Sequence, residues 1–390
     1  MKLTVLSFCI FSSPLVAQTV PCAGSFSDFL NGVRTEALAA GYSTGATSAV
    51  LNGAQIDPDV LSRDRAQGVF KQTFLEFSQR SISSYRMSHG AKNMDRYGDV
   101  FDRARREFGV PAEVITAFWA LETDYGAVQG DFNTVNALAT LAHDCRRPHL
   151  FRPQLLAAIA MVENGDLDPA TTTGAWAGEI GQVQMLPDDI LTRGIDGDGD
   201  GHVRLKISAQ DAIMTAANLI NSLGWYAGEP WLIEVTSTGS TRWDLSGLKT
   251  KLSVSEWKAM GVSARNGNMP SGGTQASLLV PQGRNGPKYL AFRNFDVYLE
   301  WNQSFIYSTT AAYLATRLGG AQRYDAGSPD QGLNDGQMKQ LQQILTDRGY
   351  DVGKIDGILG GGTRAAVQAE QIRFGMPADA WPTPALLARY

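Results

Sequence analysis

The sequence has no excess of basic residues and, after its first residues, no long apolar run. It carries 34 Lys and Arg against 39 Asp and Glu in 390 residues, a formal net charge of −5. Because proteins hold duplex nucleic acid mainly through basic faces, this balance argues against a nucleic-acid partner. The apolar runs are too short to predict a membrane span. At about 100–200 residues per domain, the length predicts two or three domains.

Cysteine and histidine are also scarce. Three cysteines and four histidines stand at none of the spacings typical of a zinc site. Cys9 lies in the N-terminal apolar stretch, which leaves Cys22 and Cys145 as a predicted disulfide in an oxidising compartment. Two unpaired buried cysteines are the alternative.

The first residues have the pattern of an export signal. Lys2 precedes a short apolar stretch that ends at the small residue Ala17. The pattern predicts a signal peptide at 1–17 and an exported protein, with a buried N-terminal helix as the alternative. A lipoprotein signal needs a small residue before its cysteine, but here Phe8 and Pro21 stand there, so we expect no lipid anchor.

Apolar residues recur at helical intervals along most of the chain and predict a mainly α-helical fold with some β structure. The β structure is expected in 228–295, where short strand-like runs alternate with turn-forming residues. The polar segment 326–336 is a predicted linker. It separates a main domain at 18–325 from a small unit at 337–390.

The stretch 110–126 places a carboxylate in an apolar helix. Glu122 falls on the same helical stripe as Ile115 and Trp119. Partial desolvation raises the pKa of a carboxyl group and lets it hold a proton near neutral pH, as a general acid in glycoside cleavage must. On this pattern alone, a solvated glutamate near a helix end is the alternative.

Six segments in a fixed order carry a family resemblance: ALETDYG, NALATL, CRRPHLFRPQL, AWAGEIGQVQMLP, IDGDGDGH and WNQSFIY. Together they resemble the lytic murein transglycosylases of the membrane-bound lytic transglycosylase B type, over about residues 26–320. The resemblance implies a lysozyme-like helical domain in the periplasm. It would cleave the β-1,4 bond between N-acetylmuramic acid and N-acetylglucosamine in peptidoglycan glycan strands, leaving a 1,6-anhydro-muramyl end.

In this resemblance Glu122 serves first as acid and then as base, and the reaction requires no cofactor. The sequence identifies no protein partner. The resemblance also implies substrate-binding residues, for each of which ordinary capping or packing is the alternative. They are Gln184, Asn302, Tyr307, Trp301, Ser304, Tyr85, Arg146 and Arg147.

Four positions depart from the family pattern. Trp301 stands where tyrosine is usual, so it keeps an aromatic face and loses the hydroxyl. Ala175 stands at a common serine position, and Leu219 replaces a cleft tyrosine. Glu179 stands where a small residue is common, and is interpreted either as a second carboxylate near the cleft or as a solvated loop residue.

An aspartate-rich loop has the front half of an EF-hand. Asp196, Asp198 and Asp200 alternate, and His202 takes the seventh place, which supplies a backbone carbonyl. No glutamate stands at the twelfth place, and Asp211 is the nearest carboxylate able to close the site. These residues predict a weak structural calcium site. A turn that caps the next helix is the alternative.

The unit at 337–390 resembles the common peptidoglycan-binding domain, a three-helix module, through the segments LQQIL, GY, DG and GGTRAAV. A helical tail that packs on the main domain is the alternative.

Two other functions compete with the transglycosylase. One is a hydrolytic muramidase in which Asp124 or Glu179 orients a water, and the other is a non-catalytic cell-wall-binding protein.

Overall fold

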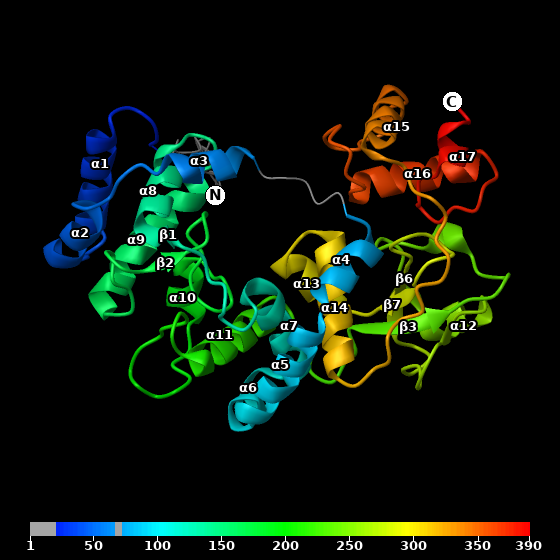
Figure 1. The fold of residues 1–390 in the computed structure, drawn as a ribbon, viewed down its shortest axis with the longest axis horizontal. Coiled ribbons are helices and arrows are strands. Elements are labelled where there is room, and N and C mark those ends of the chain that lie inside the picture. The colour runs from blue at the N-terminus through cyan, green and yellow to red at the C-terminus, as the bar shows by residue number, and fades with distance from the viewer. Residues whose placement is uncertain (1–20, 67–71) are drawn as a thin grey trace, which may run out of the picture.

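The computed structural model describes residues 21–66 and 72–390, and the signal peptide predicted at 1–17 lies outside them. The described chain is mainly helical with one small sheet region (Figure 1), which confirms the predicted fold class. Within the described residues, none of the helices is both long and apolar enough to cross a bilayer. The helices are α1 (Phe26–Ala39), α2 (Thr44–Leu51), α3 (Pro58–Arg65), α4 (Phe74–Ser81), α5 (Ser84–Arg96), α6 (Gly98–Phe108), α7 (Ala112–Thr123), α8 (Thr134–His143), α9 (Pro148–Asn164), α10 (Pro187–Arg193), α11 (Ala209–Ser222), α12 (Val254–Ala259), α13 (Phe295–Trp301), α14 (Phe305–Leu318), α15 (Asp335–Asp347), α16 (Gly361–Arg373) and α17 (Pro384–Leu387). The strands are β1 (Phe132–Asn133), β2 (Thr173–Gly174), β3 (Leu232–Thr236), β4 (Leu252–Ser253), β5 (Ser263–Ala264), β6 (Gln275–Leu279) and β7 (Tyr289–Ala291).

Helix α7 is the central helix of the main domain. Its residues from Val114 to Ala120 are buried, and α14, α5, α11 and α6 pack around it. The preceding helix α6 ends where Gly109 adopts the left-handed conformation, with φ of +72°, and α7 starts directly after Pro111. The sequence predicted this break, because glycine ends helices and proline suits their first turn. Glu122 is therefore carried by a helix that is buried along most of its length.

Most of the β structure lies inside the predicted 228–295 region, where five strands form an antiparallel sheet in the order β4-β6-β7-β3-β5. The two-residue strands β1 and β2 pair with each other outside this region. The central pairs are in register at Leu232 with Ala291 and at Leu278 with Leu290. Its own apolar core includes Trp257, fully buried, whose indole N–H donates to the carbonyl of Ala276 at 2.8 Å.

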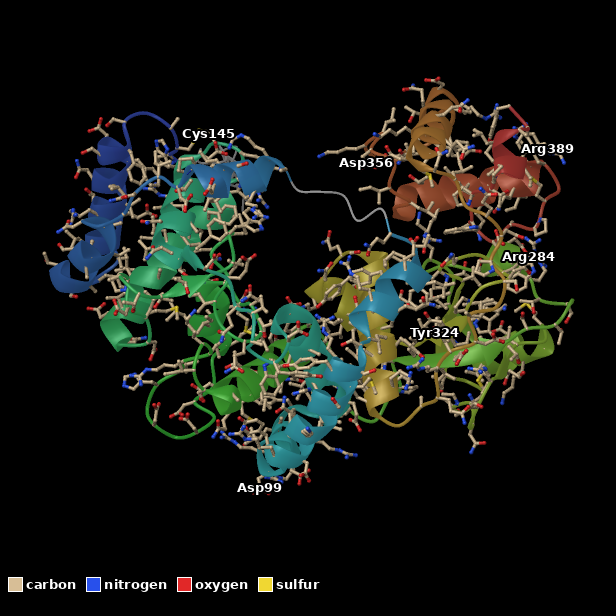
Figure 2. The ribbon with its side chains drawn as sticks, in the orientation of Figure 1. Asp99, Cys145, Arg284, Tyr324, Asp356 and Arg389 are labelled. Atoms are coloured by element: carbon tan, nitrogen blue, oxygen red, sulfur yellow. A yellow bond between two sulfur atoms is a disulfide. The ribbon has the colours of Figure 1, made fainter. Side chains whose placement is uncertain are left out.

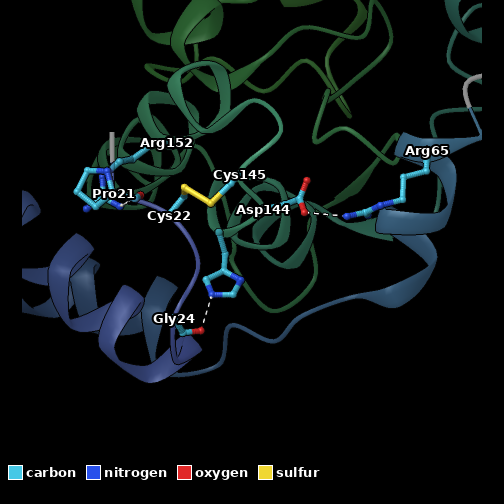
Figure 3. Close-up of a disulfide and its surroundings, with 8 residues drawn as sticks. Pro21, Cys22, Gly24, Arg65, Asp144, Cys145 and Arg152 are labelled. Atoms are coloured by element: carbon cyan, nitrogen blue, oxygen red, sulfur yellow. Dashed lines mark hydrogen bonds and ion pairs between the residues drawn. A yellow bond between two sulfur atoms is a disulfide. The ribbon is translucent and has the colours of Figure 1, made fainter. Parts of the chain in front are cut away.

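The N-terminus of the described chain is fixed to the middle of the main domain. Cys22 and Cys145, which are 123 positions apart in the sequence, form a disulfide with their Cα atoms 5.4 Å apart (Figure 3). Beside it, the backbone N–H of Ala23 donates to the carbonyl of His143 at 2.8 Å. Arg152 of α9 forms an ion pair with Glu36 of α1 at 2.7 Å. Helix α1 is thus held against the α8–α9 pair.

Three helices, α15, α16 and α17, make the C-terminal unit, as the resemblance to a peptidoglycan-binding domain implied. Leu341, Leu345, Val367 and Leu386 form its core and are fully buried. A buried carboxylate, Glu370, accepts hydrogen bonds from several side chains of the same unit. The unit therefore has an apolar centre of its own and a polar clamp around it.

The segment between α14 and α15 has no helix or strand, but it is fastened along the sheet. The backbone N–H of Tyr324 donates to the hydroxyl of Tyr313 at 2.7 Å, and that of Asp325 donates to Glu234 at 2.7 Å. The backbone N–H of Ser328 donates to the carbonyl of Asn285 at 2.9 Å. Helix α15 begins at Asp335, so it overlaps the last two residues of the linker predicted at 326–336.

The C-terminal unit packs on the sheet region. Arg284 lies between the two (Figure 2), and its backbone N–H donates to Asp379 at 3.0 Å. The Gln368 amide donates to the carbonyls of Trp243 and Ser246, both at 3.1 Å. These bonds give the C-terminal unit a fixed place against the main domain.

Candidate active site

Glu122 is the second-last residue of α7, where the helix ends abruptly. Asp124 and Tyr125 both adopt left-handed backbone conformations, with φ of 50° and 62°. Such conformations are unusual outside glycine and need support from their surroundings. Arg86 of α5 gives that support: its Nε forms an ion pair with Asp124 at 2.6 Å, and its carbonyl accepts the Tyr125 hydroxyl at 2.5 Å.

Two donors bind the same oxygen of Glu122. The indole N–H of Trp301 donates to Oε1 at 2.9 Å, and the hydroxyl of Tyr307 donates to Oε1 as well. Burial raises the pKa of Glu122 above its usual value, although these two hydrogen bonds lower it in part. Since both donors bind Oε1, Oε2 is the atom left to carry a proton. Burial therefore favours the protonated form of this carboxyl group, and Oε2 is the oxygen from which a general acid would donate.

The positions of Trp301 and Tyr307 follow from their helices. Trp301 ends α13, and its ring stacks on Phe118 of α7 with 4.2 Å between ring centres. Tyr307 lies in the first turn of α14 and is buried. Burial and the adjacent Glu122 raise the pKa of the Tyr307 hydroxyl well above its usual value, so it stays a donor. The indole N–H of Trp301 thus supplies a donor where the sequence departure removed a tyrosine hydroxyl.

A glycine-rich turn after β2 closes the other side of the α7 end. The buried amide of Gln182 accepts the indole N–H of Trp119 at 3.1 Å, and its backbone carbonyl accepts the hydroxyl of Thr123 at 2.5 Å. Gly126 has φ of +87°, and a Cβ there would come within 3.0 Å of the Gln182 side chain. Sequence analysis missed Gln182, because nothing in the pattern separates it from the neighbouring Gln184.

Gln184 adopts a left-handed backbone with φ of 52° and is half-buried. Its amide nitrogen donates to the carbonyls of Gly181 at 2.8 Å and Gln129 at 3.2 Å. The side chain is therefore held by the turn itself, and its amide oxygen is the atom it can offer to a ligand.

Asn302 and Ser304 act as capping residues. The Asn302 Oδ1 accepts the backbone N–H of Ser304 at 2.9 Å, and the Ser304 hydroxyl accepts that of Tyr307 at 3.3 Å. Ser304 is the N-cap of α14. Both residues fix the start of the helix that carries Tyr307. This is the capping role that the sequence analysis named as the alternative to substrate binding.

Arg146 and Arg147 converge on one buried carboxylate. Both form ion pairs with Asp64 of α3, Arg146 at 2.6 Å. Burial would raise the pKa of Asp64, but the hydrogen bonds from the two arginines outweigh it and lower the pKa. Arg147 also lies over the ring of Phe151, 5.0 Å from its centre. Sequence analysis missed Asp64, which lies 82 positions before Arg146.

Tyr85 lies at the rim of the site. Its ring is 46% exposed and stacks on His89 of the same helix with 3.8 Å between ring centres. It lines a cavity together with Leu121 and Tyr307. An exposed aromatic face at the mouth of such a cavity suits stacking on a ring of a bound sugar. Leu219, the departure from a cleft tyrosine, packs against the main core.

Glu179 lies in the glycine-rich turn. Its carbonyl accepts the backbone N–H of Ala175 at 3.0 Å. Burial raises the pKa of Glu179, the negative charge of Glu122 adds to the increase, and the positive charge of Arg147 reduces it. One carboxyl oxygen, Oε2, is buried and has no hydrogen-bond partner. Glu179 is thus a half-buried carboxylate whose charge interacts with that of Glu122, which favours the first of the two interpretations.

The aspartate-rich loop brings three carboxylates together. Oxygens of Asp196, Asp198 and Asp211 lie within 4.8 Å of one another. Asp211 is buried, and its two oxygens accept the backbone N–H groups of Gly197 at 2.9 Å and Arg204 at 2.7 Å. Clustered carboxylate oxygens on a tight loop are the ligand type that calcium prefers, so these residues fit the ion.

The other two predicted loop residues turn elsewhere. The Asp200 carboxylate faces Arg204 at 3.4 Å, and the His202 ring bonds Asp166 at 2.9 Å. Neither side chain joins the three clustered carboxylates. His202 was expected to contribute only its backbone carbonyl, whereas Asp200 was expected to contribute its carboxylate.

Comparison with known proteins identifies the family. Residues 25–316 match the transglycosylase SLT domain family, and residues 334–389 match the peptidoglycan binding domain family. The chain belongs to the transglycosylase SLT domain family. It is 31% identical over 238 residues to the membrane-bound lytic murein transglycosylase B of Escherichia coli strain K12. That match covers 60% of this chain and 64% of the relative.

Solved structures of the same family superpose on the chain. SltB3 from Pseudomonas aeruginosa, in complex with NAG-anhNAM-pentapeptide, has a TM-score of 0.86 and 35% identity, covering 94% of this chain and 99% of that one. The Escherichia coli lytic transglycosylase Slt35, in complex with calcium, has a TM-score of 0.65 and 25% identity, covering 78% of this chain and 97% of that one. The lysozyme-like family and the C-terminal binding module implied by the sequence are confirmed.

Proposed function

We propose that this protein is a lytic transglycosylase of peptidoglycan that cleaves the β-1,4 bond between N-acetylmuramic acid and N-acetylglucosamine. One observation carries the proposal. Glu122 is a buried carboxyl group at the end of the central helix, with two donors on Oε1 and Oε2 free. The likeness to SltB3, whose complex holds a NAG-anhNAM-pentapeptide, supports the same substrate class and the anhydro product.

Glu122 acts twice in the proposed reaction. Its Oε2 proton passes to the glycosidic oxygen as that bond breaks, and the new charge on the carboxylate is stabilised by Tyr307 and Trp301. The carboxylate then takes the proton of the muramyl C6 hydroxyl while that oxygen bonds to C1 and closes the anhydro ring. The attacking hydroxyl belongs to the substrate itself, which favours it over water by its high effective concentration.

Substrate contacts are proposed around this carboxyl group. Tyr85 offers a stacking face at the rim, Gln184 offers its amide oxygen, and Arg147 keeps about a third of its side chain exposed beside its partner carboxylate. Asn302 and Ser304 support the same site by fixing the start of α14.

The hydrolytic alternative needs a second group that holds a water. Of its two candidates, Asp124 is engaged by Arg86 and its backbone turns away from the helix, and the Oε2 of Glu179 is buried away from the solvent that would supply the water. Only Ala175 and Leu219 favour the non-catalytic alternative. Glu122 is buried, with two donors on Oε1 and Oε2 free, as a general acid requires. We therefore favour the transglycosylase.

We also propose a periplasmic location and a structural calcium ion. Both the substrate class and the disulfide suit an oxidising compartment outside the cytoplasm. Asp196, Asp198 and Asp211 would hold the ion, which would brace the loop and add nothing to the chemistry at Glu122. No cofactor is required by the proposed reaction, and protein partners are not proposed.

Mass spectrometry of the muropeptides released from purified sacculi tests the function. We expect anhydro-muramyl ends from the wild type and about a 10²–10⁴-fold loss of release for Glu122→Gln. Glu113→Gln, the same charge change at the other end of α7, is the matched control. Reducing ends would identify a muramidase, and sacculus binding without any release would identify a wall-binding protein.

A further inference from the structure

The guanidinium group of Arg364, on α16 of the C-terminal unit, contains a donor that the packing leaves unused. Its Nε is buried and has no hydrogen-bond partner among residues 21–66 and 72–390. The group donates from Nη2 to a backbone carbonyl, that of Pro281, at 2.8 Å, whereas a cation removed from water is usually paired with a carboxylate. Because an unpaired buried donor lowers stability, the position of this side chain calls for an explanation other than stability.

Three parts of the protein meet at this guanidinium group. Arg364 comes from the C-terminal unit, Pro281 follows strand β6 of the sheet region, and Phe305 is the first residue of α14. The guanidinium lies over the ring of Phe305, 4.8 Å from its centre, which is within the distance at which a cation attracts an aromatic face. The contact therefore joins the C-terminal unit to the start of the helix that carries Tyr307.

The first turn of α14 carries a donor to Glu122. Tyr307 is the third residue of this helix, and its hydroxyl donates to Oε1 of Glu122. The hydrogen bond that caps the turn, from the backbone N–H of Tyr307 to the hydroxyl of Ser304, is 3.3 Å long and lies beyond the usual range for such bonds. The cap alone therefore holds the turn weakly.

Side chains also hold this turn from outside the helix. The hydroxyl of Ser308 donates to the carbonyl of Tyr298 at 2.9 Å and fixes the turn against α13. The contact of Arg364 with the ring of Phe305 fixes it against the C-terminal unit. The position of the turn therefore depends on two different parts of the protein.

We propose that Arg364 is a positioning residue for the proton transfer: by holding the ring of Phe305, it keeps the Tyr307 hydroxyl on Oε1 of Glu122. This inference rests on the proposed function and deepens it, because it makes the C-terminal unit part of the support of the site. Arg364 gains and loses no proton in the reaction. A displacement of about 1 Å in an active site is enough to cost up to about 10²-fold in rate, so a contact outside the site can affect catalysis.

Gln368 provides a matched control on the same helix. It lies one turn after Arg364 in α16 and also reaches the main domain, but its amide donates to the carbonyls of Trp243 and Ser246 in the sheet region. Gln368→Ala therefore weakens the packing of the C-terminal unit and leaves the contact with Phe305 in place. A comparison of the two variants separates a loss of packing from a loss of positioning.

Turnover of soluble peptidoglycan glycan strands by the full-length protein tests the proposal. For Arg364→Ala we expect kcat to fall about 3–10-fold while KM stays within about twofold, because stabilisation of the transition state is weakened and substrate binding is not. Arg364→Lys, which keeps a cation beside the ring, should retain most of the wild-type kcat, and Gln368→Ala should match the wild type. Equal losses of kcat in Arg364→Ala and Gln368→Ala, or a change in KM alone, overturn the proposal.

A double-mutant cycle tests whether Tyr307 is the residue that Arg364 positions. In Tyr307→Phe the hydroxyl is absent, so adding Arg364→Ala should cause no further loss of kcat. A further loss as large as that in the wild-type background overturns the proposal. Phe305→Leu removes the ring instead of the cation, should give the same pattern, and covers the case in which Arg364→Ala does not fold.

A third readout is independent of turnover. In full-length protein carrying ¹³C-labelled glutamate, the resonance that disappears in Glu122→Gln reports the titration of Glu122. Its midpoint should rise in Arg364→Ala, as in Tyr307→Phe, because the Tyr307 hydroxyl favours the ionised carboxyl group. These variants leave in place the other charged groups near the site, which include Glu179 and the ion pair of Arg86. An unchanged midpoint overturns the proposal. If the wild type releases reducing ends, the proposed function fails, whereas a raised midpoint still supports the role of Arg364.

Discussion

The guanidinium group of Arg364 lies over the ring of Phe305, 4.8 Å from its centre. Arg364 belongs to α16 of the C-terminal unit, and Phe305 begins the helix that carries Tyr307. The same guanidinium donates to the carbonyl of Pro281 at 2.8 Å, and burial lowers the pKa of Arg364 to about 10. The C-terminal unit therefore contacts the helix that supplies a donor to Glu122, the proposed catalytic carboxyl group.

Replacing Arg364 should loosen the C-terminal unit. Arg364→Ala removes a cation–aromatic contact and a hydrogen bond, each worth about 1 kcal/mol. We expect faster protease cleavage in 319–334 and a lower midpoint for the thermal unfolding of the C-terminal unit. Arg389→Ala, at an exposed position of the same unit, is the control. Equal cleavage rates for the two variants would contradict this contact's importance.

Removing a donor to Glu122 should shift its proton affinity upward. The hydrogen bonds from Tyr307 and Trp301 favour the ionised carboxyl, so Tyr307→Phe or Trp301→Phe raises the pKa of Glu122. The alkaline limb of kcat/KM should then move to higher pH, while the maximal rate falls about 10–100-fold because the carboxylate formed on cleavage loses a donor. A limb that moves to lower pH would show that these donors do not bind the ionised form.

The buried carboxyl group of Glu122 should lower the stability of the protein at neutral and alkaline pH. Its pKa is raised in the folded protein, so its contribution is favourable at low pH and is lost as pH rises through the folded pKa. Glu122→Gln does not titrate, and we expect it to melt about 2–4 °C higher than the wild type at pH 8. Near pH 4 the two melting temperatures should agree. A difference in melting temperature that increases as the pH falls would contradict the raised pKa of Glu122.

The disulfide should contribute strongly to stability, because it closes a loop of more than a hundred residues. For Cys22→Ser with Cys145→Ser we expect a loss of about 3–5 kcal/mol of unfolding free energy, measured by urea denaturation. Adding a thiol reductant should lower the wild type to the same midpoint and leave the double variant unaffected. A wild type that is indifferent to reductant would mean that the bond is not formed in solution.

Calcium should raise the melting temperature through the three clustered carboxylates. A gain that depends on calcium concentration is expected for the wild type, since an ion that binds only the folded state stabilises it by mass action. Asp196→Asn should abolish the gain. Asp168→Asn, an exposed aspartate outside the cluster, should retain it. The same gain in both variants would place the ion elsewhere.

Local patterns in the sequence predicted most of the elements and the apolar setting of Glu122. The Gly109–Pro111 break, the apolar helix around Glu122 and the β-containing 228–295 region are all encoded by residues close together in the chain, where periodicity and turn chemistry act. Family resemblance placed Tyr307 and Trp301 near the site, but not the hydrogen bonds that both make to one oxygen.

What the sequence did not predict depends on contacts between distant segments. Asp64 forms ion pairs with Arg146 and Arg147, which lie 82 and 83 positions away in the sequence. No local pattern reveals such a partner. Gln182 is equally hidden, because its role depends on the side chain of Trp119. Asp200 was expected among the calcium ligands from its spacing, and its turn toward Arg204 reflects a competing charge.

The segment that follows α14 is hydrogen-bonded to the main domain through the backbone N–H groups of Tyr324, Asp325 and Ser328. A loose tether would let a wall-binding module search a sphere around the enzyme, and its benefit would depend on tether length. A linker that is bound along its length does not allow the module to move in this way. Any glycan held by α15–α17 would instead meet the catalytic carboxyl at one set spacing and angle.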